Sequence, residues 1–179
     1  MKHLLICTGL LVAAAALGAQ QPAASPAETT TGSIGGKAIT ISYASPRVNG
    51  RAGQLFGKDG RISKDPHYPV WRAGANAATI LKTEGDIKIG SLKVPAGSYT
   101  LFVDIADPDH WKLIVNKQTG QWGLRYDQAQ DLGSTPMTMA KPQALVENLT
   151  YTLADNGGGK GSLTLAWENH SASVQISAQ

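Results

Sequence analysis

Short runs in which apolar and polar residues alternate are the feature that most restricts how this chain can fold. Ile39, Ile41 and Tyr43, for example, alternate with Thr40 and Ser42, which is the period of a strand with one buried face. Further strand-like runs occupy residues 78–83, 86–89, 92–94, 99–105, 111–116, 137–140, 145–153, 162–167 and 173–176. Together these runs predict an all-β fold, a single antiparallel β-sandwich of the jelly-roll type, with a closed barrel as the alternative.

Turn residues separate these runs. Gly90-Ser91 is suited to a tight hairpin turn, and Pro95-Ala96-Gly97 to the turn that follows it. The glycine-rich segment 156–161 predicts a long hairpin loop. No window of a dozen residues has a helical period, and residues 125–132 predict at most one or two helical turns.

The first 19 residues have the three parts of a secretory signal peptide. Lys2 supplies the positive start, and Ala16-Leu17-Gly18 supplies small residues for cleavage. The apolar run between them has about 14 residues, fewer than the roughly 20 that span a bilayer as a helix. We therefore expect a bacterial protein that is exported to the periplasm or secreted, with a retained membrane anchor as the alternative.

The single cysteine, Cys7, lies inside this signal segment. The mature chain is therefore expected to be free of cysteine, without disulfides or thiol chemistry. Residues 20–32 are rich in Pro, Ala, Ser and Thr and predict a flexible leader. Residues 33–179 then form one β-sandwich domain, with no sign of a second domain or an internal repeat.

Charge and motifs exclude several functions. The chain has 16 Lys and Arg against 13 Asp and Glu, and losing Lys2 leaves too small an excess to indicate a nucleic acid or an anionic membrane as partner. The sequence lacks a Gly-x-Ser-x-Gly elbow and a phosphate-loop spacing. No catalytic residue, metal ligand or cofactor is predicted. The acidic residues Asp104, Asp127 and Glu168 belong to no catalytic motif, and nothing in the sequence pairs them. The histidines, His67, His110 and His170, lack the close spacing of zinc ligands.

A set of arginine, tryptophan and amide residues lies instead in segments that end or follow strands, where binding sites are commonly built. Its candidate ligand-binding residues are Arg47, Asn49, Arg51, Trp71, Arg72, Asn76, Lys117, Gln121 and Trp122. Arginine forks bind carboxylates and phosphates, and tryptophan faces bind sugars, so the set suits a neutral or anionic polar ligand such as a carbohydrate. A structural role fits equally well, with the arginines satisfying loop carbonyls and the tryptophans closing the end of the sandwich.

These segments also carry a family resemblance. The ordered motifs ISYASPRVNGR, VWRAGAN, LKVPAGSYTLF, WKLIVNKQTGQWG and LTLAWEN followed by ASVQI resemble a bacterial exported family of unknown function, number 2911 among such domains. The resemblance covers residues 33–178 and implies a signal peptide and a compact, mostly β domain. It implies no reaction, ligand or catalytic residue. The segment between Arg51 and Trp71 is longer than the family's usual link, so we expect a variant loop there.

Three functional hypotheses follow. The first is a non-catalytic β-sandwich that binds a polar ligand, such as a carbohydrate, or an envelope partner. The second is a hydrolase whose acid and base residues meet only in space, with Arg72 holding an anionic substrate. The third is a purely structural envelope protein in which the arginines and tryptophans only hold loops.

Overall fold

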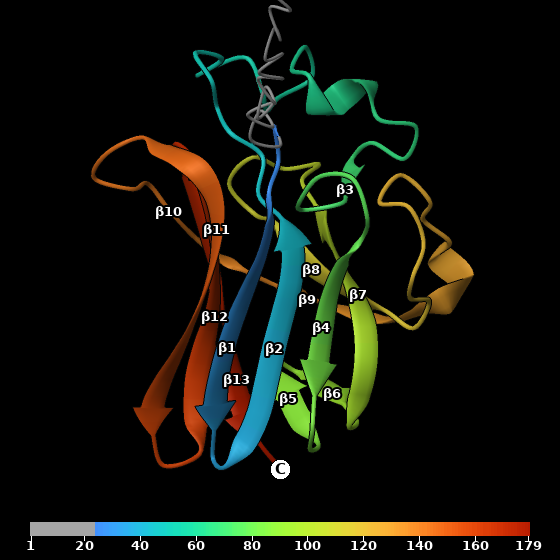
Figure 1. Ribbon diagram of the computed structural model, residues 1–179, viewed down its shortest axis with the longest axis vertical. Coiled ribbons are helices and arrows are strands. Elements are labelled where there is room, and N and C mark those ends of the chain that lie inside the picture. The colour runs from blue at the N-terminus through green and yellow to red at the C-terminus, as the bar shows by residue number, and fades with distance from the viewer. Residues whose placement is uncertain (1–23) are drawn as a thin grey trace, which may run out of the picture.

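The computed structural model describes residues 24–179, which form two antiparallel sheets packed face to face (Figure 1). The predicted β-sandwich is confirmed, and the described strands do not close into the alternative barrel. The expected signal peptide, residues 1–19, and Cys7 within it lie outside the described residues.

The first sheet has the strand order β1-β2-β4-β7-β8-β9, and the short strand β3 pairs with β7. Its strands are β1 (Ala27–Ile34), β2 (Lys37–Ala44), β3 (Val70–Trp71), β4 (Thr79–Thr83), β7 (Gly97–Asp104), β8 (Lys112–Asn116) and β9 (Asp131–Pro136).

The second sheet has the order β11-β12-β13-β5-β6, and β10 pairs with β13. Its strands are β5 (Ile87–Ile89), β6 (Leu92–Val94), β10 (Thr138–Ala140), β11 (Val146–Gly157), β12 (Lys160–Glu168) and β13 (His170–Ala178). The chain crosses from one sheet to the other more than once, so neither sheet is continuous in sequence.

One apolar cluster fills the space between the sheets. Ile39 and Ile41 of β2 and Leu163 and Leu165 of β12 all belong to it and are buried. Their alternation with exposed or half-buried neighbours is the period seen in the sequence. Burial of each such side chain contributes about 1.5 to 3 kcal/mol to folding.

β7 departs from this alternation because both of its faces are covered. The segment between β8 and β9 folds back over its outer face, where the Phe102 ring meets the Tyr126 ring at a centroid distance of 4.9 Å. Thr100 is also buried there, and its hydroxyl donates to the carbonyl oxygen of Gln118 at 2.7 Å. The central strand of the first sheet is therefore protected from solvent on both sides.

The predicted flexible leader, residues 20–32, is wrong for its second half. Ala27–Ile34 forms β1, which pairs with β2 in continuous register from Ala27 opposite Ala44 to Ile34 opposite Lys37. Only Ile34 of this strand is buried, so the strand lacks the apolar alternation that marks the others. Its threonines favour an extended backbone, and the ladder to β2 holds it in place.

The long loop predicted for residues 156–161 is also wrong. β11 extends to Gly157 and β12 begins at Lys160, so only Gly158 and Gly159 form the turn. Their φ values of 60° and 73° are those of the two-residue turns that match the twist of a hairpin. Glycine adopts this left-handed backbone without strain.

The other departures are small. Residues 125–132 contain one 3₁₀ turn, η2 (Gln128–Gln130), where the Asp127 side chain accepts a hydrogen bond from the amide of Ala129 at 3.0 Å. β3 and β9 were not expected, because neither has an alternating apolar pattern. They are held as strands by their ladders to β7 and β8.

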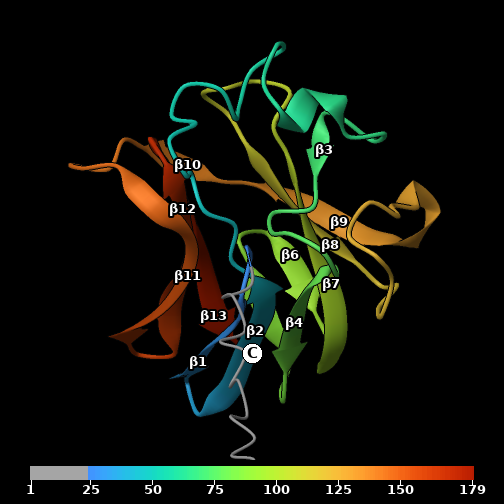
Figure 2. The same cartoon turned by 45° about the horizontal axis from the view of Figure 1, so that its top comes forward.

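The segment between β2 and β3 covers one end of the sandwich, as the views in Figures 1 and 2 agree. It contains a second 3₁₀ turn, η1 (Ile62–Lys64). Leu55 and Ile62 are buried, and Phe56 packs on the core. The variant loop expected here is therefore anchored by apolar side chains.

Among residues 24–179, no helix has the length and apolar character needed to cross a membrane.

Core packing leads to a first prediction. Leu163→Ala, at a side chain with 0% exposure, should lower the free energy of unfolding by about 2 to 5 kcal/mol, because it opens a cavity between the sheets. Leu145→Ala, at a side chain with 46% exposure, should change it by less than about 0.5 kcal/mol. Urea unfolding followed by tryptophan fluorescence measures both, and equal effects would contradict the described core.

Candidate functional site

The candidate binding residues divide among three places. Arg51, Trp71 and Arg72 line one cavity at the loop-covered end of the sandwich. Arg47 and Asn49 lie in the loop after β2, beside β11. The remaining four, Asn76, Lys117, Gln121 and Trp122, lie outside this cavity.

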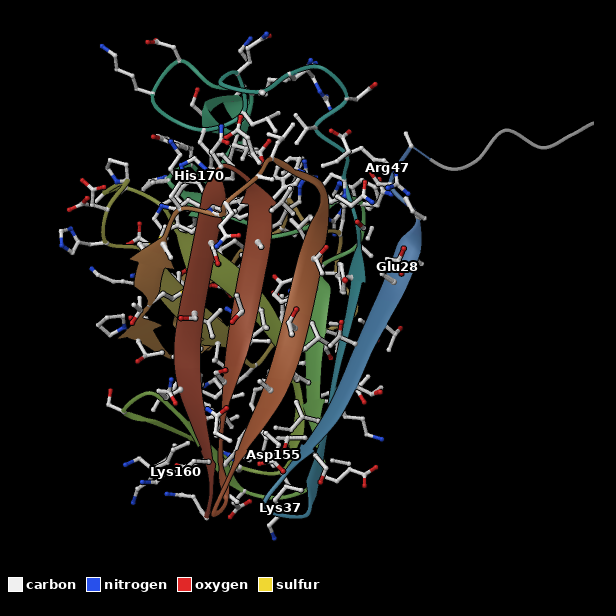
Figure 3. All side chains as sticks on the ribbon, turned by 90° about the vertical axis from the view of Figure 1, so that its left-hand side faces the viewer. Glu28, Lys37, Arg47, Asp155, Lys160 and His170 are labelled. Carbon is white, nitrogen blue, oxygen red and sulfur yellow. The ribbon has the colours of Figure 1, made fainter. Side chains whose placement is uncertain are left out.

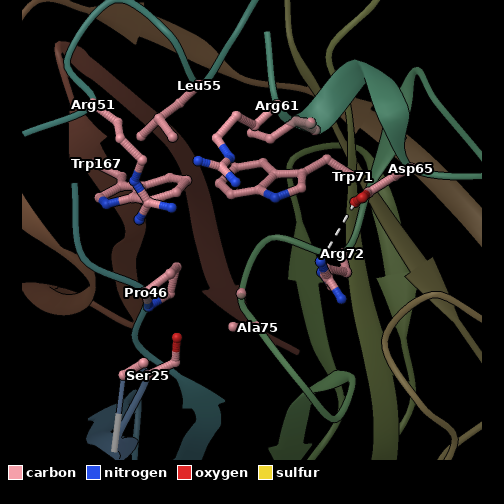
Figure 4. A pocket seen from close by; sticks show the side chains of 13 residues that line it. Ser25, Pro46, Arg51, Leu55, Arg61, Asp65, Trp71, Arg72, Ala75 and Trp167 are labelled. Atoms are coloured by element: carbon pink, nitrogen blue, oxygen red, sulfur yellow. Dashed lines mark ion pairs between the residues drawn. The ribbon is translucent and has the colours of Figure 1, made fainter. Parts of the chain in front are cut away.

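The cavity has a volume of about 380 Å³, within the usual range of small-molecule sites. We call it the arginine cavity, because three arginines line it (Figure 4). It is lined by Ala24, Ser25, Pro46, Arg51, Leu55, Arg61, Ile62, Asp65, Trp71, Arg72, Gly74, Ala75 and Trp167.

Two stacked tryptophans from opposite sheets form part of the wall. Trp71 belongs to β3 of the first sheet and Trp167 to β12 of the second, and their rings lie 5.9 Å apart with an angle of 12° between their planes. Phe56 of the covering loop meets both rings edge-on, at 5.3 and 5.8 Å. Both tryptophans are buried, so the wall is rigid and largely apolar.

The segment after Trp71 is held in place by its backbone. The Ala73 carbonyl accepts hydrogen bonds from the Tyr151 hydroxyl at 2.8 Å and from the Thr79 hydroxyl at 3.1 Å. The Ala75 amide donates to the carbonyl of Ala44 at 3.2 Å. The chain turns sharply here, with left-handed φ values of 46° at Ala73 and 58° at Asn76. These contacts fix the direction in which Arg72 leaves the backbone.

Arg51 is largely occupied by its own loop. Its Nε donates to the Val48 carbonyl at 2.8 Å, and one terminal nitrogen donates to the Arg47 carbonyl at 2.6 Å. This is the structural role weighed for the arginines, in which a side chain satisfies carbonyls that have no ladder partner. The guanidinium still lines the arginine cavity and contributes its positive charge there.

Arg72 is less completely paired. Its closest charged neighbour is Asp65, with 3.7 Å between the nearest nitrogen and oxygen atoms, which is longer than a hydrogen bond. Its Nε is buried and has no hydrogen-bond partner within residues 24–179. Gly123 leaves room for this side chain, since a Cβ there would lie 2.8 Å from the Arg72 Cδ. Arg72 is therefore a cation held at the cavity with unused donor capacity.

Asp65 and Arg61 complete the polar lining and were missed by the sequence analysis. Burial raises the pKa of the Asp65 carboxyl above its ordinary value, and the Arg72 charge opposes this. Arg61 precedes η1 and is exposed. Both residues belong to the covering loop, and no motif in that segment links them to Arg72.

Arg47 and Asn49 have structural contacts. Arg47 forms an isolated bridge to Asn148, and its carbonyl accepts from Arg51. Asn49 has a left-handed φ of 49°, and its amide donates to the Glu147 carboxylate at 2.7 Å. They attach the loop after β2 to the start of β11 and do not line the arginine cavity.

The other four candidate residues lie around the segment between β8 and β9. The Asn76 carbonyl accepts from the Gly123 amide at 2.9 Å, and the Gln121 side chain donates to the Thr100 hydroxyl at 3.2 Å. Trp122 is 51% exposed and Lys117 is exposed. The predicted set is therefore not one site.

A buried carboxylate, Glu168, directly follows Trp167 at the end of β12. Glu168 is 2% exposed, and one of its oxygens accepts from the Gly53 amide at 2.6 Å. Its other oxygen lies 3.4 Å from Nδ1 of His170. The His170 ring stacks on Trp111 with 5.3 Å between centroids and contacts Phe56 at 4.5 Å. These contacts connect the covering loop to β12 and β13.

Burial lowers the pKa of His170 below its ordinary value, and the Glu168 carboxylate partly opposes this effect. Within the described range 24–179, no group of three or more His, Cys, Asp or Glu side chains is placed to hold a metal ion. Asp104 and Asp127 lie near Tyr126, whereas Glu168 is buried at the end of β12, so these three acids from the sequence analysis do not share one cleft.

A comparison with protein families finds one match. A family model described as a protein of unknown function (DUF2911) matches residues 25–176. No curated protein and no solved structure matches the chain significantly. The matched range begins before the boundary expected from the sequence and includes all of β1.

The His170 environment predicts a pH effect. Because its pKa is lowered in the folded state, His170 stabilises the fold fully above the unfolded value of about 6.5, and this contribution is lost as the pH falls below that value. The unfolding midpoint should therefore fall less steeply between pH 7.5 and 5.5 in His170→Gln than in the unmodified protein. Thermal unfolding measures both slopes.

His67→Gln is the matched control for the loss of an imidazole, since His67 is exposed. Identical slopes for the unmodified protein and His170→Gln would contradict a lowered pKa of the half-buried His170 ring in the folded state.

Proposed function

The chain belongs to the DUF2911 family, a family of unknown function, and we propose that it is an exported, non-catalytic β-sandwich. It binds an acidic sugar in the arginine cavity. The ligand class follows from the lining. Three arginines suit a carboxylate, and the Ser25 and Asp65 side chains suit the hydroxyl groups of a sugar.

The observation that carries the proposal is the incomplete pairing of Arg72. A buried donor without a partner costs about 1 to 3 kcal/mol, and Arg72, which lines the cavity, has such a donor at its Nε within residues 24–179. Trp167, another lining residue, has a buried Nε1 in the same condition within residues 24–179. A ligand carboxylate would pair with the terminal nitrogens of the Arg72 guanidinium, of which the nearest lies 3.7 Å from the Asp65 carboxylate.

An envelope partner and a purely structural role both account for the cavity less well than a small ligand does. An envelope protein as partner would need a broad complementary surface, whereas the lining here is concave and of ligand size. A purely structural role accounts for Arg51, whose donors reach loop carbonyls, but leaves Arg72 Nε without a function. The expected signal peptide supports export to the periplasm or the medium as part of the proposal.

Arg72→Gln tests the proposal. Titration with D-galacturonate, followed by tryptophan fluorescence, should show saturable binding to the unmodified protein and at least about tenfold weaker binding to Arg72→Gln, because a charge-assisted hydrogen bond is worth about 1.5 to 3 kcal/mol. D-galactose, which lacks the carboxylate, should bind more weakly to the unmodified protein than D-galacturonate does.

Arg125→Gln removes the same charge from an exposed residue outside the arginine cavity and should leave the affinity unchanged. Absence of galacturonate binding, or equal binding by all variants, would reject the proposal. A loss of stability in Arg72→Gln with no binding in any variant would favour the structural role instead.

One observation favours a hydrolase as the second candidate. Asp65 is the carboxylate among the lining residues of the arginine cavity, it lies beside Arg72, and its pKa is raised by burial, as in many catalytic acids and bases. Esterase, phosphatase and glycosidase substrates should show no turnover by a binding protein. Turnover that Asp65→Asn abolishes would replace the binding function with a catalytic one.

A further inference from the structure

A second cavity lies in the covering loop next to the arginine cavity. It has a volume of about 690 Å³, and we call it the glycine-loop cavity because three glycines line it. Its lining residues are Gly53, Gln54, Phe56, Gly57, Lys58, Asp59, Gly60, Arg61 and Lys64. Part of the backbone of this loop is used within the fold, since the Gly53 amide donates to the Glu168 carboxylate and the Gly60 amide donates to the Gly57 carbonyl. The Gln54 and Asp59 side chains are exposed.

The two cavities adjoin each other. Arg61 lines both, and the neighbouring residues Leu55 and Phe56 line the first and the second respectively. The loop that separates them is held by Phe56, which packs among three tryptophans and His170. A ligand that spans the cavities would therefore pass Arg61 on an anchored surface.

Positive charge is concentrated in this pair of cavities. Five cationic residues line them, against Asp59 and Asp65, which gives a local excess of three; the five are Arg51, Lys58, Arg61, Lys64 and Arg72. Residues 24–179 as a whole have an excess of only two, since Lys2 is the one charged residue before them. The remainder of the described chain is thus slightly negative. Within the described residues, Arg72 is the one member of the five that forms an ion pair.

The lining of the two cavities suits an acidic polysaccharide better than an anionic lipid surface. The exposed large apolar side chains of the described chain, Trp122 and Leu145, lie outside both cavities, so this surface lacks the apolar residues that insert into a lipid headgroup layer. The cations lie here beside Gln54 and Asp59, whose side chains supply acceptors and donors for hydroxyl groups. Carboxylates and hydroxyls along one chain are the chemistry of an acidic polysaccharide.

We propose that the ligand is a segment of acidic polysaccharide of several sugar units, bound across the arginine cavity and the glycine-loop cavity. This inference rests on the proposed function and specifies its ligand. The arginine cavity holds one acidic sugar, and Lys58 and Lys64 bind the carboxylates of the units that follow. Linked units then gain affinity because each later contact is intramolecular.

The test compares D-galacturonate with trigalacturonate at low salt. The trimer should bind at least about tenfold more tightly than the monomer. The double variant Lys58→Gln/Lys64→Gln should lose most of that advantage and keep the affinity for the monomer within about twofold, since neither lysine lines the arginine cavity. These lysines are exposed, so the double variant is expected to fold normally.

Lys93→Gln/Lys160→Gln is the matched control, because both lysines are exposed and neither lines either cavity. Figure 3 shows Lys160 at the end of the sandwich opposite His170. This control should bind both ligands as the unmodified protein does.

The outcomes separate the two proposals. A monomer that binds through Arg72 and a trimer that binds no more tightly would overturn the extended site and leave the arginine cavity intact. Failure of both ligands would reject the proposed function together with this inference. Equally tight binding of triglutamate, or sedimentation with phosphatidylglycerol vesicles that the lysine double variant abolishes, would assign the surface to an acidic peptide or a membrane instead.

Discussion

The stack of Trp71 on Trp167 is the contact on which the loop-covered end of the molecule depends. Each ring comes from a different sheet, so their contact fixes the distance between the sheets where the ladders end. The same rings give Phe56 a place to pack, and through Phe56 they anchor the loop between β2 and β3. Without that anchor, the loop residues Arg61 and Asp65 would have no fixed position relative to Arg72. A core contact thereby sets the geometry of the candidate site.

The sequence predicted those strands in which buried residues alternate with more exposed ones. β2, β12 and β13 have this alternation, and they were expected. β1 was missed because its ladder to β2, with only Ile34 buried, determines its structure. β3 and β9 were missed for a related reason, since pairing with a neighbouring strand leaves no local pattern.

The candidate site was predictable only in part, because it is built from four separated segments. Arg51, Trp71 and Arg72 were identified from their residue types and their place after strands, and the fold brings them together. Trp167 was seen as part of a strand, and Arg61 and Asp65 lay in a loop with no motif. The two arginines differ in how far the fold occupies their donors. Arg51 donates to two loop carbonyls, which is a structural role. Arg72 retains an unpaired donor within the described residues.

The position of β1 has a consequence for how copies of the protein behave together. β1 and β11 are the outer strands of their sheets on one side of the sandwich, and they lie side by side there, where the Thr30 hydroxyl donates to the Tyr151 carbonyl at 2.9 Å (Figure 1). An outer strand with free backbone groups is a template for pairing with another molecule. Since each of these strands shields the other, a threonine-rich segment with almost no core residues covers this pair of sheet edges against pairing with another molecule.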